Sequence, residues 1–380
     1  MKIAIYTITS PLHDEKAVCA ATATFLDSLH IDYALSEGSF DSYGQHDLDL
    51  IYVRTGGTEN VFKAALPQLR KQSDRPFYLL TSGKSNSLAA SLEILSFLRQ
   101  QGLPGEVLHG SAEYVASRIG LLAKVGEAHR SLDNCRLGII GKPSDWLISS
   151  GYDVAAVRRR LGVELVEIPM QELKDALPET NDVHEGLRKL LGQYQLQGFT
   201  LRCFDLLTAL HNTGCLALAQ LGAEGFVAGC EGDVPAMLSM IVAKTLTGHQ
   251  GFQANPARID CETGEILFAH CTIPLNMVER YELDTHFESG IGVGVRGFVK
   301  AGPVTILKVS GDLSRWFVEE GMLLECQAKP DLCRTQLLVR LTDASRASYF
   351  LTNPIGNHHI VVLGHHKRLL EEFLALTVCR

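Results

Sequence analysis

Strand-length apolar runs alternate with helical segments through the first 250 residues, and this alternation is the strongest constraint on the fold. In the first third the expected strands are Lys2–Ile8, Leu50–Val53, Pro76–Thr81 and Gly105–His109, and the expected helices are Glu15–Leu29, Glu59–Leu69 and Leu88–Arg99. Strands joined by helices form mostly parallel sheets with helices on both faces. We therefore predict a doubly wound, Rossmann-like α/β domain over residues 1–110.

A second series of the same kind follows a long helical segment at about Ala112–Leu132. Its expected strands are Cys135–Ile140, Val163–Ile168, Thr200–Phe204 and Gly225–Gly229, and its expected helices are Val154–Leu161, Asp182–Tyr194 and Pro235–Leu246. The two series share a pattern but no close sequence repeat. We predict a second doubly wound parallel-sheet domain over residues 111–250.

Helical periodicity fades after about residue 250, where short runs rich in Gly, Thr and Val succeed one another. These runs are Glu265–Thr272, Gly292–Val299, Val304–Lys308, Gln336–Leu341, Ser348–Leu351 and Ile360–Leu363. Many short strands indicate a β-barrel or sandwich, which we expect over residues 251–380 with a closing helix at about His366–Leu376.

Charge and cysteine usage narrow the class of protein. The 380 residues carry a net charge of −8, which argues against nucleic acid or an anionic membrane as a partner. The apolar run at Ile3–Ile8 is too short for a signal sequence, and no run reaches transmembrane length. Ten cysteines without a Cys-x-x-Cys pair are typical of reduced core cysteines, so we expect a cytoplasmic protein.

Glu231 stands where an apolar strand ends and a helix begins, with glycines at 229 and 232 close on either side. Ligands of open α/β sheets bind at the carboxyl ends of the strands. Asp233 is expected to cap the following helix, whose first turn contains Pro235. Glu231 has no such structural role, so we expect it to be functional.

Three histidines are further candidates. His358 and His359 precede the apolar run Ile360–Leu363, and neighbouring residues of a strand point to opposite faces, so at most one of the two faces a given site. His270 ends an apolar strand, where it either lines a site or is a buried histidine bonded to backbone. A carboxylate and an imidazole from these segments indicate a divalent-metal site.

Two loops that follow strands are candidate ligand-binding loops. The loop Arg54–Thr58 opens a helix and either holds an anion or sugar hydroxyls or is a tight turn with Thr58 as the N-cap. The loop Lys142–Trp146 carries a tryptophan that either stacks on a sugar face or fills a gap between domains.

The segments around Glu231 and His358 resemble a known family. The run from Glu231 to Asn255, with Leu246-Thr-Gly248 and Phe252-Gln-Ala254, resembles the metal-binding segment of bacterial L-fucose isomerase without a gap. The run Gly356–His365 resembles that family's C-terminal metal-histidine segment. These motifs cover roughly residues 225–275 and 350–366. The chain looks like a short, divergent member of the L-fucose and L-arabinose isomerase group.

This resemblance implies an aldose–ketose isomerase that uses Mn²⁺ or another hard divalent cation. By position, Glu231 is a metal ligand and acid/base, and His358 is a metal ligand. The third ligand position, an aspartate in L-fucose isomerase, is Asn255 here, a candidate for both ligation and catalysis. Asp260 is an alternative occupant of that position, and His270 is a candidate for a further ligand.

The resemblance also implies a small-molecule sugar as substrate and a homo-oligomer with its sites near subunit interfaces. His270, Asp260, Arg54, Trp146 and His359 are the candidate substrate-binding residues. Two alternatives remain open: a non-catalytic carbohydrate-binding or regulatory relative of the same fold, and a metal-dependent lyase or epimerase that shares the enediol chemistry.

Overall fold

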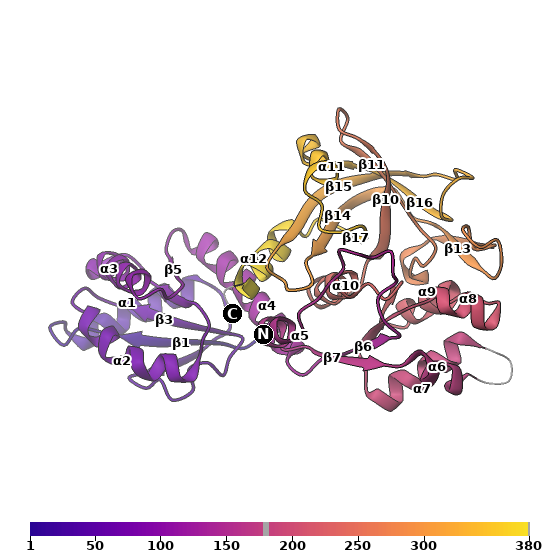
Figure 1. The fold of residues 1–380 in the computed structure, drawn as a ribbon. Coiled ribbons are helices and arrows are strands. Elements are labelled where there is room, and N and C mark those ends of the chain that lie inside the picture. The colour runs from indigo at the N-terminus through magenta and orange to yellow at the C-terminus, as the bar shows by residue number, and fades with distance from the viewer. Residues whose placement is uncertain (178–181, 379–380) are drawn as a thin grey trace. The chain divides into compact units, whose positions relative to one another are not determined.

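The computed structural model describes residues 1–177 and 182–378, and the described chain divides into two compact units, residues 1–130 and residues 131–378 (Figure 1). The expected boundary at residue 110 lies just before the helix α4 (Ala112–Leu132), most of which belongs to the first unit. The expected boundary near residue 250 falls inside the second unit, which contains both the second sheet and the barrel.

The first unit is built on a five-stranded parallel sheet in the order β2-β1-β3-β4-β5. Its strands are β1 (Ile3–Ile8), β2 (Ala34–Glu37), β3 (Leu48–Val53), β4 (Phe77–Leu80) and β5 (Gly105–Leu108). Helices α1 (Glu15–Ser28) and α4 pack on one face, and α2 (Glu59–Gln72) and α3 (Ser87–Gln100) pack on the other. Because helices cover both faces, β1 and β3 are buried throughout, and the predicted doubly wound sheet is confirmed.

The second unit begins with a four-stranded parallel sheet in the order β7-β6-β8-β9. Its strands are β6 (Arg136–Ile140), β7 (Glu164–Ile168), β8 (Gly198–Leu201) and β9 (Val227–Cys230). The helices that accompany it are α5 (Val154–Leu161), α6 (Met170–Ala176), α7 (Val183–Tyr194), α8 (Phe204–Leu210) and α9 (Cys215–Ala223). Side chains of α6, α7 and α9 form the core on one face of this sheet.

Helix α10 (Val234–Thr247) joins the sheet of the second unit to the barrel that follows. It contacts β8 and β9 of the sheet and two strands of the barrel, β14 (Gly302–Val309) and β17 (His359–Leu363). Every side chain from Val234 to Ala243 is buried, as expected of a helix covered on both sides. The loops at the start of α10 therefore lie where sheet and barrel meet.

The C-terminal part of the second unit is a closed six-stranded barrel in the order β10-β11-β16-β15-β14-β17. The remaining barrel strands are β10 (Phe252–Asp260), β11 (Glu265–His270), β15 (Trp316–Cys326) and β16 (Thr335–Leu341). Phe252, Phe268 and Phe317 fill its interior. The terminal helix α12 (Lys367–Val378) contacts β15 and α10, and the predicted β-barrel and closing helix are confirmed.

Two of the predicted C-terminal strands differ in the structure. The run Ser348–Leu351 is not a strand: a 3₁₀ turn, Ala344–Ser348, leads into the short helix α11 (Tyr349–Thr352). Asp343 accepts a hydrogen bond from the backbone of Ser345, and such local capping favours a helical turn over a strand. The glycine-rich run at 292–299 does form a strand, β13 (Gly294–Phe298), but it pairs with β12 (Arg280–Asp284) outside the barrel.

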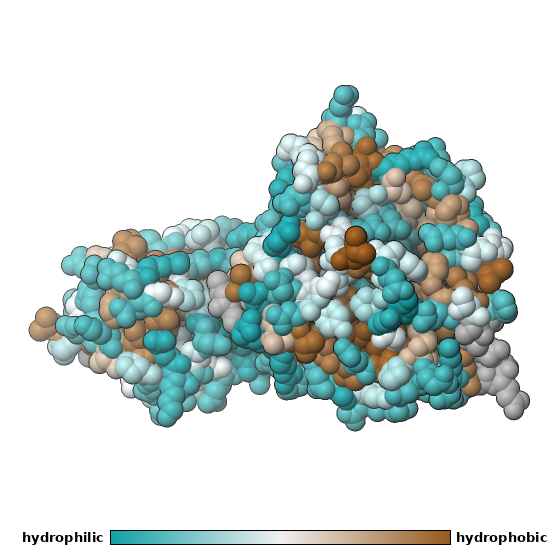
Figure 2. Space-filling view, in the orientation of Figure 1, coloured by the Kyte–Doolittle hydropathy of each residue, from teal (hydrophilic) through white to brown (hydrophobic). Residues whose placement is uncertain are grey.

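Within the described residues, none of the helices combines the length and the apolar character that a membrane span requires. Figure 2 shows a surface on which hydrophilic residues predominate and hydrophobic ones are dispersed among them.

Candidate metal centre

Three side chains from separate segments of the second unit converge beside the start of α10. Glu231 directly follows β9, His270 ends β11, and His358 directly precedes β17. One ligand atom from each of the three lies within 4.8 Å of the other two. Among the described residues, this is the group of three histidine, cysteine or carboxylate side chains close enough to share a metal ion. The sheet thus supplies the carboxylate and the barrel supplies both imidazoles.

The distances fit three ligands of one metal ion. Oε1 of Glu231 lies 3.4 Å from Nε2 of His270 and 3.5 Å from Nε2 of His358. Ligand bonds of about 2.0–2.2 Å at tetrahedral angles separate neighbouring ligand atoms by roughly 3.4 Å. Nε2 of His358 is buried and has no hydrogen-bond partner within the described structure. Buried polar atoms are usually hydrogen-bonded, so this nitrogen is a candidate metal ligand.

The backbone holds Glu231 in an unusual conformation. Its φ angle is +63°, in the left-handed region that residues with a side chain seldom adopt. The Glu231 carbonyl accepts a hydrogen bond from the Ser144 amide at 3.0 Å, and the amide of Gly232 donates to the Leu201 carbonyl at 3.0 Å. Strain of this kind is maintained where the surrounding structure aims a side chain at a functional site.

The second oxygen of the Glu231 carboxylate is held by Trp146. The indole Nε1 donates to Oε2 at 2.7 Å, and the ring packs edge-on against Phe204 with 4.7 Å between ring centroids. The carboxylate is therefore anchored by one oxygen while the other faces the two histidines. The sequence does not predict this hydrogen bond, because residues 146 and 231 are 85 positions apart.

Asp233 serves both the helix and the site. Its Oδ1 accepts from the Ala236 amide at 2.9 Å, which confirms the predicted helix cap. Its Oδ2 lies 2.8 Å from Nδ1 of His358, and because a carboxylate accepts, the imidazole donates through Nδ1. In the neutral imidazole, which is the form that binds a metal, Nε2 then has the lone pair and faces Glu231, as in a histidine ligand oriented by a carboxylate.

Negative charge surrounds the His358 imidazole. Burial alone would lower its pKa, but Asp233 and Glu231 outweigh that effect and raise the pKa of His358 to about 9. Burial would likewise raise the pKa of Glu231, yet the contacts with His270 and His358 hold that pKa well below its usual value. The position between the three side chains therefore favours a positive charge.

Lys308 lies behind Asp233. Its Nζ is 3.6 Å from Oδ2 of Asp233, and both side chains are buried, at 1% and 0% exposure. Burial raises the pKa of Asp233, but Lys308 and His358 outweigh it and lower the pKa to about 2, so the carboxylate is ionised at neutral pH. A lysine inside an apolar barrel strand is the signal of this pair in the sequence.

His270 completes the cluster in a role that the sequence left open. Its Nδ1 is 3.1 Å from the Thr272 hydroxyl, which orients the ring, and its Nε2 faces Glu231. The rings of His270 and His358 pack edge to face, 5.3 Å apart. Of the two interpretations of His270, lining a site describes its position better than bonding to backbone.

Asn255 lies on β10 beside the segment that carries His358. Its Oδ1 accepts a hydrogen bond from Nδ2 of Asn357 at 2.8 Å, and its backbone pairs with Ala269 of β11. Asn255 therefore braces the loop before His358. As a metal ligand it remains a prediction.

Two further candidates, Asp260 and Arg54, make local contacts of their own. Asp260 is at the far end of the β10–β11 hairpin, where its Oδ1 caps the turn by accepting from the amides of Glu262 and Thr263. It is therefore not positioned as a substitute ligand, because its carboxylate closes an exposed turn. Arg54 belongs to the first unit, where its Nε donates to the Thr9 hydroxyl at 2.5 Å.

His359 points into the barrel rather than toward Glu231. Its Nε2 is 3.1 Å from the Tyr349 hydroxyl, and its ring packs on Phe350. The rule that adjacent strand residues face opposite sides thus separates His358 from His359 as expected. Its assignment as a substrate-binding residue is not consistent with this fully buried position.

Comparison with known proteins gives one kind of relative. No family model matches the chain. Sulfoquinovose isomerases of Priestia aryabhattai and Priestia megaterium are each 24% identical to it over 281 residues, covering 64% of this chain and 63% of each relative. The match thus spans less than two thirds of the relatives' length. The chain is similar to proteins named as sugar isomerases, and the finer resemblance to L-fucose and L-arabinose isomerases stays a prediction.

Proposed function

We propose that this chain is a metal-dependent aldose–ketose isomerase. The observation that carries the proposal is the convergence of one carboxylate, Glu231, with the Nε2 atoms of His270 and His358. The similarity to sulfoquinovose isomerases supports the same reaction class. The convergence of the three side chains and the similarity to these isomerases are independent lines of support.

The donor set narrows the metal. Two imidazoles and one carboxylate suit divalent transition ions such as Mn²⁺, Fe²⁺, Co²⁺ or Zn²⁺ better than Mg²⁺, which prefers oxygen ligands. The metal positions that the resemblance implies include one imidazole, His358, and on that basis Mn²⁺ or another hard divalent cation is expected. Mn²⁺ remains the proposed ion, now ahead of Mg²⁺.

The reaction needs a base beside C1 and C2 of the sugar. Converting an aldose to a ketose moves a proton between these carbons through an enediol, and a carboxylate within hydrogen-bond reach accepts and returns it. Glu231 is ionised at neutral pH, and Trp146 holds its position through Oε2. A divalent cation held by the three side chains supplies Lewis acidity at the sugar oxygens.

Sulfoquinovose, the sulfonated sugar in the relatives' name, is the first substrate to test, followed by unsubstituted aldoses. The runner-up function is a carbohydrate-binding protein without turnover, and the observation that favours it is Asn255, which offers no second carboxylate.

The decisive experiment titrates Mn²⁺ into chelator-stripped protein and follows thermal unfolding. A ligand at a hundredfold excess over its Kd stabilises the native state by roughly 2.7 kcal/mol. We expect this stabilisation in the wild type and its loss in Glu231→Gln, His270→Gln and His358→Gln. His365→Gln, at an exposed histidine of the same unit, is the matched control and keeps it.

Activity is then measured with the sugar panel in the presence of Mn²⁺. Ketose formation by the wild type and its loss in Glu231→Gln support the isomerase. Metal binding without turnover of any sugar, or sugar binding that persists with chelator, would replace it with the binding function. Wild-type stability unchanged by any of the transition ions would refute the metal site.

A further inference from the structure

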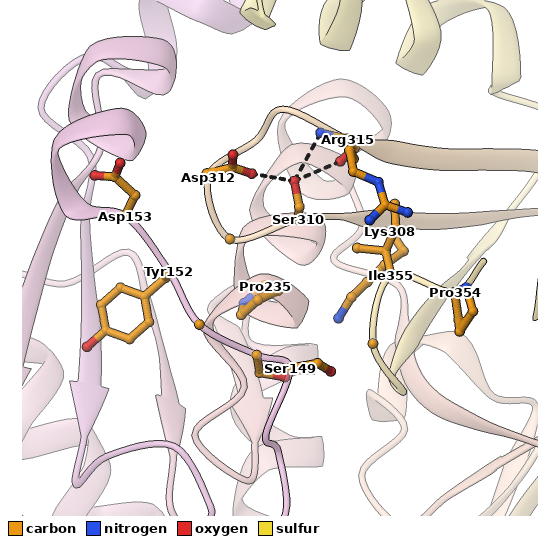
Figure 3. Close-up of a pocket in the computed structure, with 14 residues that line it drawn as sticks. Ser149, Tyr152, Asp153, Pro235, Lys308, Ser310, Asp312, Arg315, Pro354 and Ile355 are labelled. Carbon is orange, nitrogen blue, oxygen red and sulfur yellow. Dashed lines mark hydrogen bonds between the residues drawn. The ribbon is translucent and has the colours of Figure 1, made fainter.

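A cavity of about 300 Å³ opens in the second unit beside Lys308 (Figure 3). Its wall includes Ser149, Pro235, Ser310, Arg315 and Gly356, and it lies between the loop before α5, the start of α10 and the β14–β15 turn. A water takes about 30 Å³ of liquid volume, so this space accommodates a small organic or inorganic solute.

Lys308 points into this cavity. Figure 3 shows its side chain descending from the strand, with the nitrogen in the space between Pro235 and Ser149. The side chain is 1% exposed, and Nζ has no hydrogen-bond partner among the residues that the structure describes. An ammonium has three donors, and leaving them unpaired in a buried place is costly. The cavity must therefore supply acceptors.

The ion pair with Asp233 does not meet this need. Oδ1 of Asp233 already accepts from Ala236 and Oδ2 from His358, and the distance to Nζ is 3.6 Å, beyond hydrogen-bond length. Asp233 balances the charge of Lys308, but it leaves the ammonium without a hydrogen-bond acceptor among the described residues.

The other charged side chains of the wall are of both signs, and they are exposed or partly exposed, whereas Lys308 is buried. Arg315 adds a second cation at the wall. Asp153 and Asp312 also line it, but Asp153 is exposed and caps α5 through Ala156, and Asp312 accepts from Ser310 and Ser314. Carboxylates at a wet rim are screened, whereas a buried ammonium is not.

We infer that this cavity is a binding site for a small oxyanion, of the sulfonate, sulfate or phosphate class, with Lys308 as its buried anchor. Arg315 and the hydroxyl of Ser149 are the further donors within its wall. The site is separate from the proposed metal ligands and does not depend on the isomerase activity. The anion is either a free ion or the acid group of a small molecule.

Calorimetric titration of chelator-stripped protein with sodium sulfate and sodium phosphate, against sodium chloride of equal ionic strength, tests the site. We expect saturable binding of an oxyanion that chloride does not reproduce. Ser149→Asp places a negative charge at an exposed wall position and weakens the affinity at least about tenfold. Asn276→Asp, the same charge change at an exposed residue outside the wall, leaves it unchanged.

Lys308→Gln abolishes binding, while Lys300→Gln at an exposed lysine retains it. If Lys308→Gln does not fold, Ser149→Asp and Arg315→Gln decide the question. Titration of the same metal-free protein with sulfoquinovose distinguishes a free ion from a sugar sulfonate. Binding of either solute that Ser149→Asp weakens supports the site. Absence of saturable binding by all three solutes, or binding that no wall variant weakens, would overturn it.

Discussion

Nδ1 of His358 lies 2.8 Å from Oδ2 of Asp233, so the carboxylate that caps α10 also orients a histidine 125 residues further along the chain. The same oxygen balances the buried charge of Lys308. Helix start, barrel strand and proposed metal ligand are thus joined through one side chain.

Asp233→Asn is expected to destabilise the protein by about 3–5 kcal/mol, because it leaves Lys308 as a buried cation without its counterion. Asparagine caps helices as well as aspartate does, so loss of the cap does not explain the cost. Urea denaturation of the single variant and of Asp233→Asn combined with Lys308→Met measures the coupling. The double variant recovers part of the stability, and strictly additive costs would contradict the pairing.

Trp146→Phe is expected to weaken Mn²⁺ binding by about tenfold while changing stability by less than about 1 kcal/mol. Phenylalanine keeps a ring against Phe204 but cannot donate to Oε2 of Glu231. The chain's other tryptophan offers a matched control: Trp316→Phe leaves the affinity unchanged. Equal Mn²⁺ affinities of Trp146→Phe and wild type would show that the hydrogen bond does not position the carboxylate.

Much of the architecture was predictable, because hydrophobic period and turn residues are local properties of the chain. The alternation of apolar strand-length runs with helical segments indicated parallel sheets. The glycines around Glu231 indicated the end of a strand with a candidate functional residue. The short exposed strand Ala34–Glu37 escaped prediction, since an edge strand has no buried face to impose an apolar pattern.

The composition of the candidate site was less predictable, because it depends on which strand ends the barrel brings together. His270 lies close to Glu231 only in the folded barrel, and the sequence of residues 267–274 does not indicate this long-range contact. Asp260 illustrates the opposite error: it lies five residues from Asn255 in the sequence but at the other end of a hairpin. Nearness along a strand is not nearness to a site.

Gly232→Ala is expected to destabilise the second unit by at least about 1–3 kcal/mol. The residue has a φ of +69°, and a Cβ there would lie 2.5 Å from the Lys142 carbonyl oxygen. Gly192→Ala in α7 is the matched control, since its Cβ would meet nothing within 4 Å. A helical alanine there stabilises by up to about 1 kcal/mol. Thermal unfolding that moves both variants in the same direction would be inconsistent with this strain.

Thiol reactivity is expected to separate the cysteines by their burial. Cys19 and Cys261 are exposed, whereas burial raises the pKa of Cys135 to about 11. A thiol that stays protonated reacts slowly, so a disulfide reagent at neutral pH labels Cys19 and Cys261 first and Cys135 only after unfolding. Mass spectrometry of peptides from timed samples identifies each site, and early labelling of Cys135 would contradict its buried position.

The topology of the barrel sets the order in which the proposed metal ligands are synthesised and brought together. β17 is inserted between β10 and β14, and His358 immediately precedes it. A chain leaving the ribosome exposes Glu231 and His270 long before His358, and until β17 arrives both neighbouring strands present unpaired edges. The three proposed ligands therefore come together at the step in which β17 pairs with the edges of β10 and β14. An interrupted chain that lacks β17 would be prone to aggregate, and it would not hold His358 in place beside Glu231 and His270.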